Sequence, residues 1–222
     1  MTTRTALRLA SVLGVSGVAV YVGTTVLGGV LDPTYSHASH TISELTGAGA
    51  PNRDLLAALY ITYNLLLVGF GYALHRAMPH EQLLRIGMHL FILSGVAGVL
   101  MVTAFPTDLP GAVPTAIGRG HIAIAGVASA LIVAATFVLG FAFRRVDALR
   151  FLAPGSFIAG AAIVVSGPLT AFAVAANSPF EGVFERITIG LFLLWVWGIS
   201  MYMLLEVPVH GTFDARTRAI RL

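Results

Sequence analysis

The residues most able to do chemistry gather in one segment, 32–54, which follows the first long apolar run of the chain. This segment combines serines, histidines and carboxylates. A serine, a base and an orienting carboxylate within hydrogen-bond reach are what nucleophilic hydrolysis requires. The candidate catalytic or ligand-binding residues of the segment are Asp32, Tyr35, Ser36, His37, His40, Ser43 and Glu44.

Further polar residues stand at or near the ends of later apolar runs. Asp108 closes a Phe-Pro-Thr-Asp motif after the third run, and His121 opens the fourth. Glu185 and Arg186 lie one to two turns inside the sixth run, where an ionised group normally faces the interior and finds a partner. Asn64 in the second run can join them. If these runs are membrane-spanning helices, the side chains reach a common level and predict one polar pocket.

Two kinds of role are open to these residues. In an enzyme, we expect Glu44 or Asp108 to be the acid or base partner of His121, with Ser36 or Ser43 as nucleophile or headgroup ligand. The sequence has no Gly-x-Ser-x-Gly elbow, so hydrolysis is one alternative among several.

The same side chains can instead be structural. Asp32 is well placed to cap a helix, Asp108 to hold a turn, and Glu185 with Arg186 to form an ion pair.

A metal site is a weaker alternative. His37-x-x-His40 has the spacing of metal ligands, and Glu44, Asp108 or His121 would have to complete the set. The chain has no cysteine, which excludes thiolate ligands. No histidine pair is well placed to hold haem between helices. We therefore expect neither a metal nor a cofactor.

Composition indicates which elements position these residues. The set AVILMFWYC makes up 57% of the 222 residues and charged residues only 10%, against about 45–50% and about 25% in soluble domains. Six runs are long enough for a helix to cross a bilayer core of about 30 Å. We predict an all-α, six-helix transmembrane bundle forming one domain over residues 1–222, with spans at about 6–31, 55–74, 84–105, 121–143, 151–176 and 180–205.

The arginines predict the orientation, because basic residues in short loops favour the cytoplasmic side. All 13 basic residues are arginine. One side of the alternating map holds Arg4, Arg8, Arg76, Arg85, Arg144, Arg145, Arg150, Arg216, Arg218 and Arg221. The other holds Arg53, Arg119 and Arg186. We predict both termini in the cytoplasm and contact with anionic lipid, not with nucleic acid.

Signals for helix ends add detail. Asp32-Pro33 has the pattern of an N-cap and first helical residue, which predicts a short helix over Pro33–Leu45 at the outer membrane surface. Ser178 and Glu181 have capping-box spacing at the start of the sixth span. Pro168 predicts a kink inside the fifth.

A family resemblance rests on four motifs. These are the run from Asp32 to Leu45, then Phe105-Pro106-Thr107-Asp108, then Gly118-Arg119-Gly120-His121, and Glu185-Arg186 in the last span. Together they resemble the uncharacterised bacterial and archaeal membrane proteins of the domain of unknown function 998 family. The resemblance covers nearly the whole chain and implies six spans with polar motifs at the outer face. It implies no activity, cofactor or substrate.

We therefore expect a multi-pass protein of the inner or plasma membrane whose outward-facing pocket binds or processes a lipid or other amphiphile. An enzyme of this kind would be a hydrolase or transferase. One alternative is a small proton-coupled transporter that uses Glu185, Arg186 and Asn64. Another is an assembly protein without chemistry. Membrane lipids are the expected partners, and the sequence is compatible with an oligomer.

Overall fold

The computed structural model describes residues 3–205, and all regular structure in that range is helical. Its long helices are Thr3–Leu31 (α1), Arg53–Ala77 (α2), Gln82–Ala104 (α3), Ala116–Arg144 (α4), Leu152–Ala175 (α5) and Glu181–Leu205 (α6). Short 3-10 helices occupy Ser43–Thr46 (η1) and Asp147–Leu149 (η2). Each of the six long helices is long and apolar enough to cross a bilayer, which confirms the predicted six-span architecture.

Side-chain caps explain where several helices begin. The hydroxyl of Thr115 accepts the Gly118 N–H at 2.9 Å, so α4 starts five residues before the predicted His121. Ser178 accepts the Phe180 N–H at 3.2 Å, and α6 begins at Glu181. The predicted capping box is therefore not formed. The Glu181 N–H donates to the Ser178 carbonyl and the Ser178 N–H donates to the Ala173 carbonyl, so Ser178 holds a turn that precedes α6.

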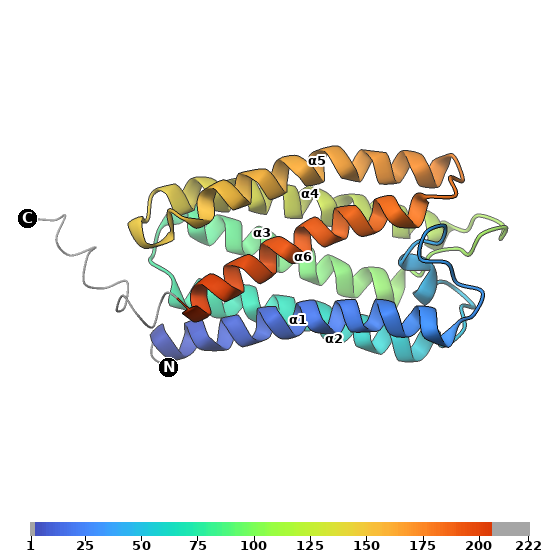
Figure 1. Cartoon of the computed structure of the whole chain (residues 1–222), viewed down its shortest axis with the longest axis horizontal. Coiled ribbons are helices and arrows are strands. Elements are labelled where there is room, and N and C mark those ends of the chain that lie inside the picture. The colour runs from blue at the N-terminus through green and yellow to red at the C-terminus, as the bar shows by residue number, and fades with distance from the viewer. Residues whose placement is uncertain (1–2, 206–222) are drawn as a thin grey trace, which may run out of the picture.

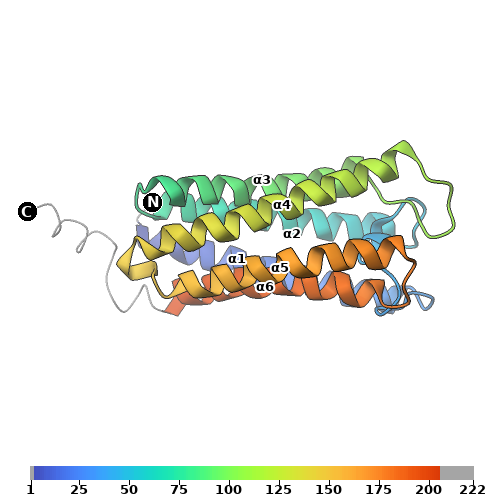
Figure 2. The same cartoon turned by 90° about the horizontal axis from the view of Figure 1, so that it is seen from above.

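The helices form a closed ring in which each packs against the next and α6 returns to α1 (Figures 1 and 2). Aromatic side chains fill the middle of the ring. The Phe91 ring of α3 lies 5.6 Å from Phe70 of α2 and 6.0 Å from Trp195 of α6, measured between centroids. The Trp195 indole donates to the Ser156 hydroxyl of α5 at 2.9 Å, which satisfies a buried N–H.

One end of the bundle carries the connections that hold the polar motifs. Residues 32–52, 105–115 and 176–180 all lie at this end, which we call the long-loop end, whereas α1 begins and α6 ends at the opposite one (Figure 1). The Ala48 N–H donates to the Thr107 carbonyl at 2.9 Å, so the first two of these connections contact each other.

The first loop differs from its predicted form. In place of a helix over Pro33–Leu45, the structure has turns followed by η1 at Ser43–Thr46. The reason lies in side chains that bind the loop's own amides and so compete with a helix. Asp32 accepts the Thr34 N–H at 3.0 Å, His40 Nδ1 accepts the Ser36 N–H at 3.0 Å, and Glu44 accepts the Thr41 N–H at 2.8 Å.

Candidate functional site

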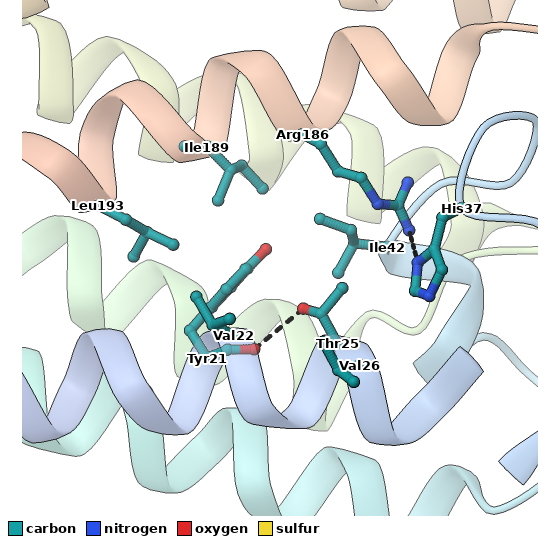
Figure 3. Close-up of a pocket in the computed structure, with 10 residues that line it drawn as sticks. Tyr21, Val22, Thr25, Val26, His37, Ile42, Arg186, Ile189 and Leu193 are labelled. Carbon is teal, nitrogen blue, oxygen red and sulfur yellow. Dashed lines mark hydrogen bonds between the residues drawn. The ribbon is translucent and has the colours of Figure 1, made fainter. Parts of the chain in front are cut away.

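A groove of about 330 Å³ lies between the first and last helices, beneath the long-loop end (Figure 3). Its lining residues are Tyr21, Val22, Thr25 and Val26 of α1, His37 and Ile42 of the first loop, and Arg186, Ile189, Gly190 and Leu193 of α6. The loop residues and Arg186 stand at one end, while Ile189 and Leu193 line the groove further along α6 (Figure 3).

The groove opens sideways, toward the surroundings of the bundle. Val22 and Val26 on its α1 side are 49% and 55% exposed, although both are apolar. In a bilayer, such a face meets lipid chains. The opening of the groove thus lies on the outside of the ring, beside the exposed face of α1.

Arg186 is the charged residue of the groove. Its Nη1 donates to the carbonyls of His40 at 3.0 Å and Gly182 at 2.9 Å, and its Nη2 donates to the Tyr35 hydroxyl and to His37 Nδ1 at 3.1 Å. All four acceptors are neutral. No carboxylate within residues 3–205 forms an ion pair with this guanidinium.

Glu185 binds a different part of the same loop. Its Oε2 accepts the Ile42 N–H, and its Oε1 accepts the Ser43 hydroxyl at 3.3 Å. The structure thus brings Glu185, Arg186, Tyr35, His37 and Ser43 into one neighbourhood. Of the two roles left open for Glu185 and Arg186, the ion pair is not formed within the described residues. Glu185 accepts from residues 42–43, and Arg186 donates to loop 32–52 and to the Gly182 carbonyl.

The loop lies directly on the first turn of α6. The Val183 N–H donates to the Ala38 carbonyl at 3.2 Å. A β-carbon at Gly182 would stand 2.3 Å from the His40 oxygen and 2.8 Å from the His37 oxygen, so only glycine allows this approach.

Tyrosines from two helices build the wall behind the groove. The Tyr21 ring of α1 packs edge-on against Tyr60 and Tyr63 of α2, with centroids 5.2 and 4.7 Å away. The Thr25 and Tyr60 hydroxyls are hydrogen-bonded at 2.9 Å. This cluster fixes the α1 side of the groove against α2.

The electrostatics of the loop favour neutral partners around Arg186. Burial raises the pKa of Tyr35 to about 12, and the nearby Arg186 only partly opposes this rise, so the phenol stays protonated. Desolvation, and then the charge of Arg186, lowers the pKa of His37 below its ordinary value. Near neutral pH the imidazole is therefore uncharged and its Nδ1 lone pair accepts from Arg186.

Asp108 and His121 form a separate cluster at the α3–α4 connection. Asp108 accepts the Thr115 N–H and hydroxyl, both at 2.8 Å, and these bonds lower the pKa of its carboxyl. His121 is 7% exposed, and its Nδ1 is hydrogen-bonded to the Phe105 carbonyl at 2.7 Å. Both side chains fasten the connection to the start of α4.

The remaining candidates make local contacts. Glu44 binds the Thr41 N–H and hydroxyl, and Asp32 binds Thr34 in an exposed turn, where these bonds lower the pKa of its carboxyl. The Ser36 hydroxyl accepts the Ser39 N–H at 3.4 Å. Asn64 donates to the Tyr60 carbonyl of its own helix and packs on Gly98 of α3, outside the groove.

The residues expected to form a catalytic set make their hydrogen bonds to other partners. Across residues 3–205, no hydrogen bond joins His121 to Glu44, Asp108, Ser36 or Ser43. The two histidines of the His-x-x-His pattern flank the Tyr35 ring, with Nδ1 of His37 facing Arg186 and Nδ1 of His40 bound to Ser36. The described chain offers no cluster of three or more His, Asp or Glu side chains able to hold a metal ion.

Sequence reasoning missed the part of the groove that α1 supplies. Tyr21 and Thr25 stand four residues apart in the first span and therefore share one helix face. Polar groups on that face indicate that it points to the interior of the bundle. The apolar residues Val22, Val26 and Ile189 carry no signal of their own. Any residue that faces lipid would look the same.

Fold and site together define a polytopic helical membrane protein with a lateral groove that is apolar along its length and cationic at one end. Over residues 15–201 the chain matches the family described as Protein of unknown function (DUF998), and it belongs to that family. Comparison with curated proteins and with solved structures gave no match.

Proposed function

We propose that this is a plasma-membrane protein that binds a lipid or other amphiphile of the outer leaflet in the α1–α6 groove. The observation that carries the proposal is the shape of the groove: apolar walls open to lipid, ending at polar groups of the first loop and Arg186. An amphiphile has the same division into apolar chain and polar head. A site of a few hundred Å³ with apolar walls and few polar groups is typical of small-ligand binding.

The depth of the groove agrees with a headgroup site. Arg186 lies on the second turn of α6, and Leu193 lies seven residues further, which is about 10 Å along a helix. A bound amphiphile would therefore keep its head near the membrane surface and its chain in the upper half of the bilayer.

Binding is favoured over chemistry and over transport. The side chains expected to form a catalytic set are instead engaged in fastening loops and helix starts. A path across the membrane would need polar groups continuing past the groove, and the ring there is filled by Phe91, Phe192 and Trp195.

Photocrosslinking tests the proposal. The full chain is reconstituted into nanodiscs with a lysophosphatidylcholine that carries a diazirine in its acyl chain, and crosslinks are mapped by mass spectrometry. We expect them on α1 and α6 peptides that contain Val22, Val26 and Ile189. The substitution Gly190→Leu should fill the groove and reduce labelling, since nothing lies within 4 Å of a β-carbon built there.

Gly167→Leu on α5 is the matched control, because it too enters open space but does not line the groove. Its labelling should equal that of the wild type. Equal labelling of α1 and α6 in both variants would overturn the proposal.

A further inference from the structure

We propose that the occupant of the groove is a single-chain lipid whose head is an oxyanion, a phosphate or a carboxylate, bound by Arg186. This inference rests on the proposed function and specifies its ligand class. The starting observation is a partly buried guanidinium at the long-loop end whose four hydrogen-bond acceptors are all neutral.

Arg186 forms no ion pair within the described residues, although the charge of the adjacent Glu185 acts on it through space. The ion pairs of the described residues are Arg53–Asp54, Arg145–Glu81 and Arg150–Asp147. The adjacent carboxylate, Glu185, accepts the Ile42 N–H and the Ser43 hydroxyl instead. A charge removed from water is costly unless an opposite charge approaches it, so this site favours an anion.

The guanidinium also retains hydrogen-bonding capacity toward the groove. Of its five N–H groups, those on Nη1 and Nη2 have partners, whereas Nε has none within the described chain. The His37 ring is exposed and stands at the end of the groove, so an oxyanion can replace its Nδ1 as the acceptor. Guanidinium binds carboxylate and phosphate with paired hydrogen bonds, which are stronger than bonds to neutral acceptors.

Size limits the rest of the ligand. A volume of about 330 Å³ stands at the lower limit of the range for small-molecule sites. Most of the wall beside Arg186 is apolar and is formed by Val22, Val26, Ile189 and Leu193, while Tyr21 and Thr25 also line it. One acyl chain fits this groove better than two. The inferred ligand is therefore a monoacyl anionic lipid.

The test compares ligands that share a chain and differ in the head. Binding of hexadecyl phosphate and of hexadecyl maltoside to the full chain in zwitterionic nanodiscs is measured by radioligand titration, with inorganic phosphate as a competitor. We expect hexadecyl phosphate to bind about tenfold more tightly. Arg186→Gln should abolish this preference, and Arg119→Gln, the same charge change at the same end of the bundle but outside the groove, should preserve it.

Each outcome decides the inference. The wild-type comparison does not depend on any variant, so equal affinities for the two heads overturn the anionic class even if Arg186→Gln fails to fold. Inorganic phosphate could also displace hexadecyl phosphate equally well from the wild type and from Gly190→Leu. That result would indicate a site for free anions and would overturn the inference of an anionic lipid.

The proposed function can survive that failure. If Gly190→Leu weakens both ligands equally and the wild type shows no head preference, the groove binds amphiphiles but does not select anions. If Gly190→Leu weakens neither, both proposals fail.

Discussion

Glu185 and Arg186 are neighbours in the sequence, yet their charged groups hold two different stretches of one loop. The carboxylate binds the backbone and side chain of residues 42–43, and the guanidinium binds Tyr35, His37 and the His40 carbonyl. The pair acts as a double anchor between α6 and the loop. The site therefore depends on loop and helix being assembled together.

Two substitutions distinguish the hydrogen bonds that Glu185 accepts from the effect of its charge. Glu185→Ala leaves the Ile42 N–H without its acceptor and should lower the free energy of unfolding by about 1–3 kcal/mol. Glu185→Gln keeps a carbonyl oxygen and should lose clearly less. Thermal unfolding gives the stability, and hydrogen exchange at the Ile42 amide locates the change. Equal exchange in the alanine variant and the wild type would contradict the anchor.

The close approach at Gly182 has a sharp steric test. Gly182→Ala places a methyl group 2.3 Å from the His40 oxygen, so the loop must shift, at a cost of about 1–3 kcal/mol in unfolding free energy. Gly190→Ala meets nothing within 4 Å and should instead stabilise α6 by about 0.5–1 kcal/mol. Opposite changes in melting temperature are expected, and a loss of equal size in both variants would refute the packing described.

Acid should weaken the loop through His37. Its pKa is below the ordinary value of about 6.5, because partial desolvation and then the charge of Arg186 disfavour the charged ring. The unfolded chain thus binds the proton more readily, and the contribution to stability, complete above about pH 6.5, is lost as pH falls through the folded pKa. Melting temperature is measured against pH for the wild type and for His37→Gln. The difference between the two curves should shrink in acid; a constant difference would exclude this role.

The orientation predicted from the arginines awaits a direct measurement. Reporter fusions at Gly111, in the α3–α4 connection, and at Arg145, after α4, should report opposite sides of the membrane, with Arg145 in the cytoplasm. The α3–α4 connection and the end of α4 lie at opposite ends of the bundle (Figure 2). The reverse assignment would place the groove in the inner leaflet.

Helix positions could be predicted because a bilayer imposes a length and an apolar composition on every span. The loop conformation could not, since Asp32-Pro33 fits a helix start as well as the turn that Thr34 completes. Distances between loops could not be predicted either. The predicted spans place Asp108 and His121 at the same membrane level as Arg186, but the structure places them on the α3–α4 side of the ring. Glu44 was predicted to be a catalytic acid or base, whereas in the structure its carboxylate accepts hydrogen bonds from the Thr41 N–H and hydroxyl.

The closure of the ring by α6 on α1 also sets an order of events during biosynthesis. The ribosome delivers Tyr21 and Val26 well before Arg186 and Leu193, so the groove cannot exist until α6 has been made. Until the sixth helix inserts, the exposed edge of α1 has no native neighbour on that side. Ligand occupancy would consequently distinguish finished molecules from those arrested during insertion.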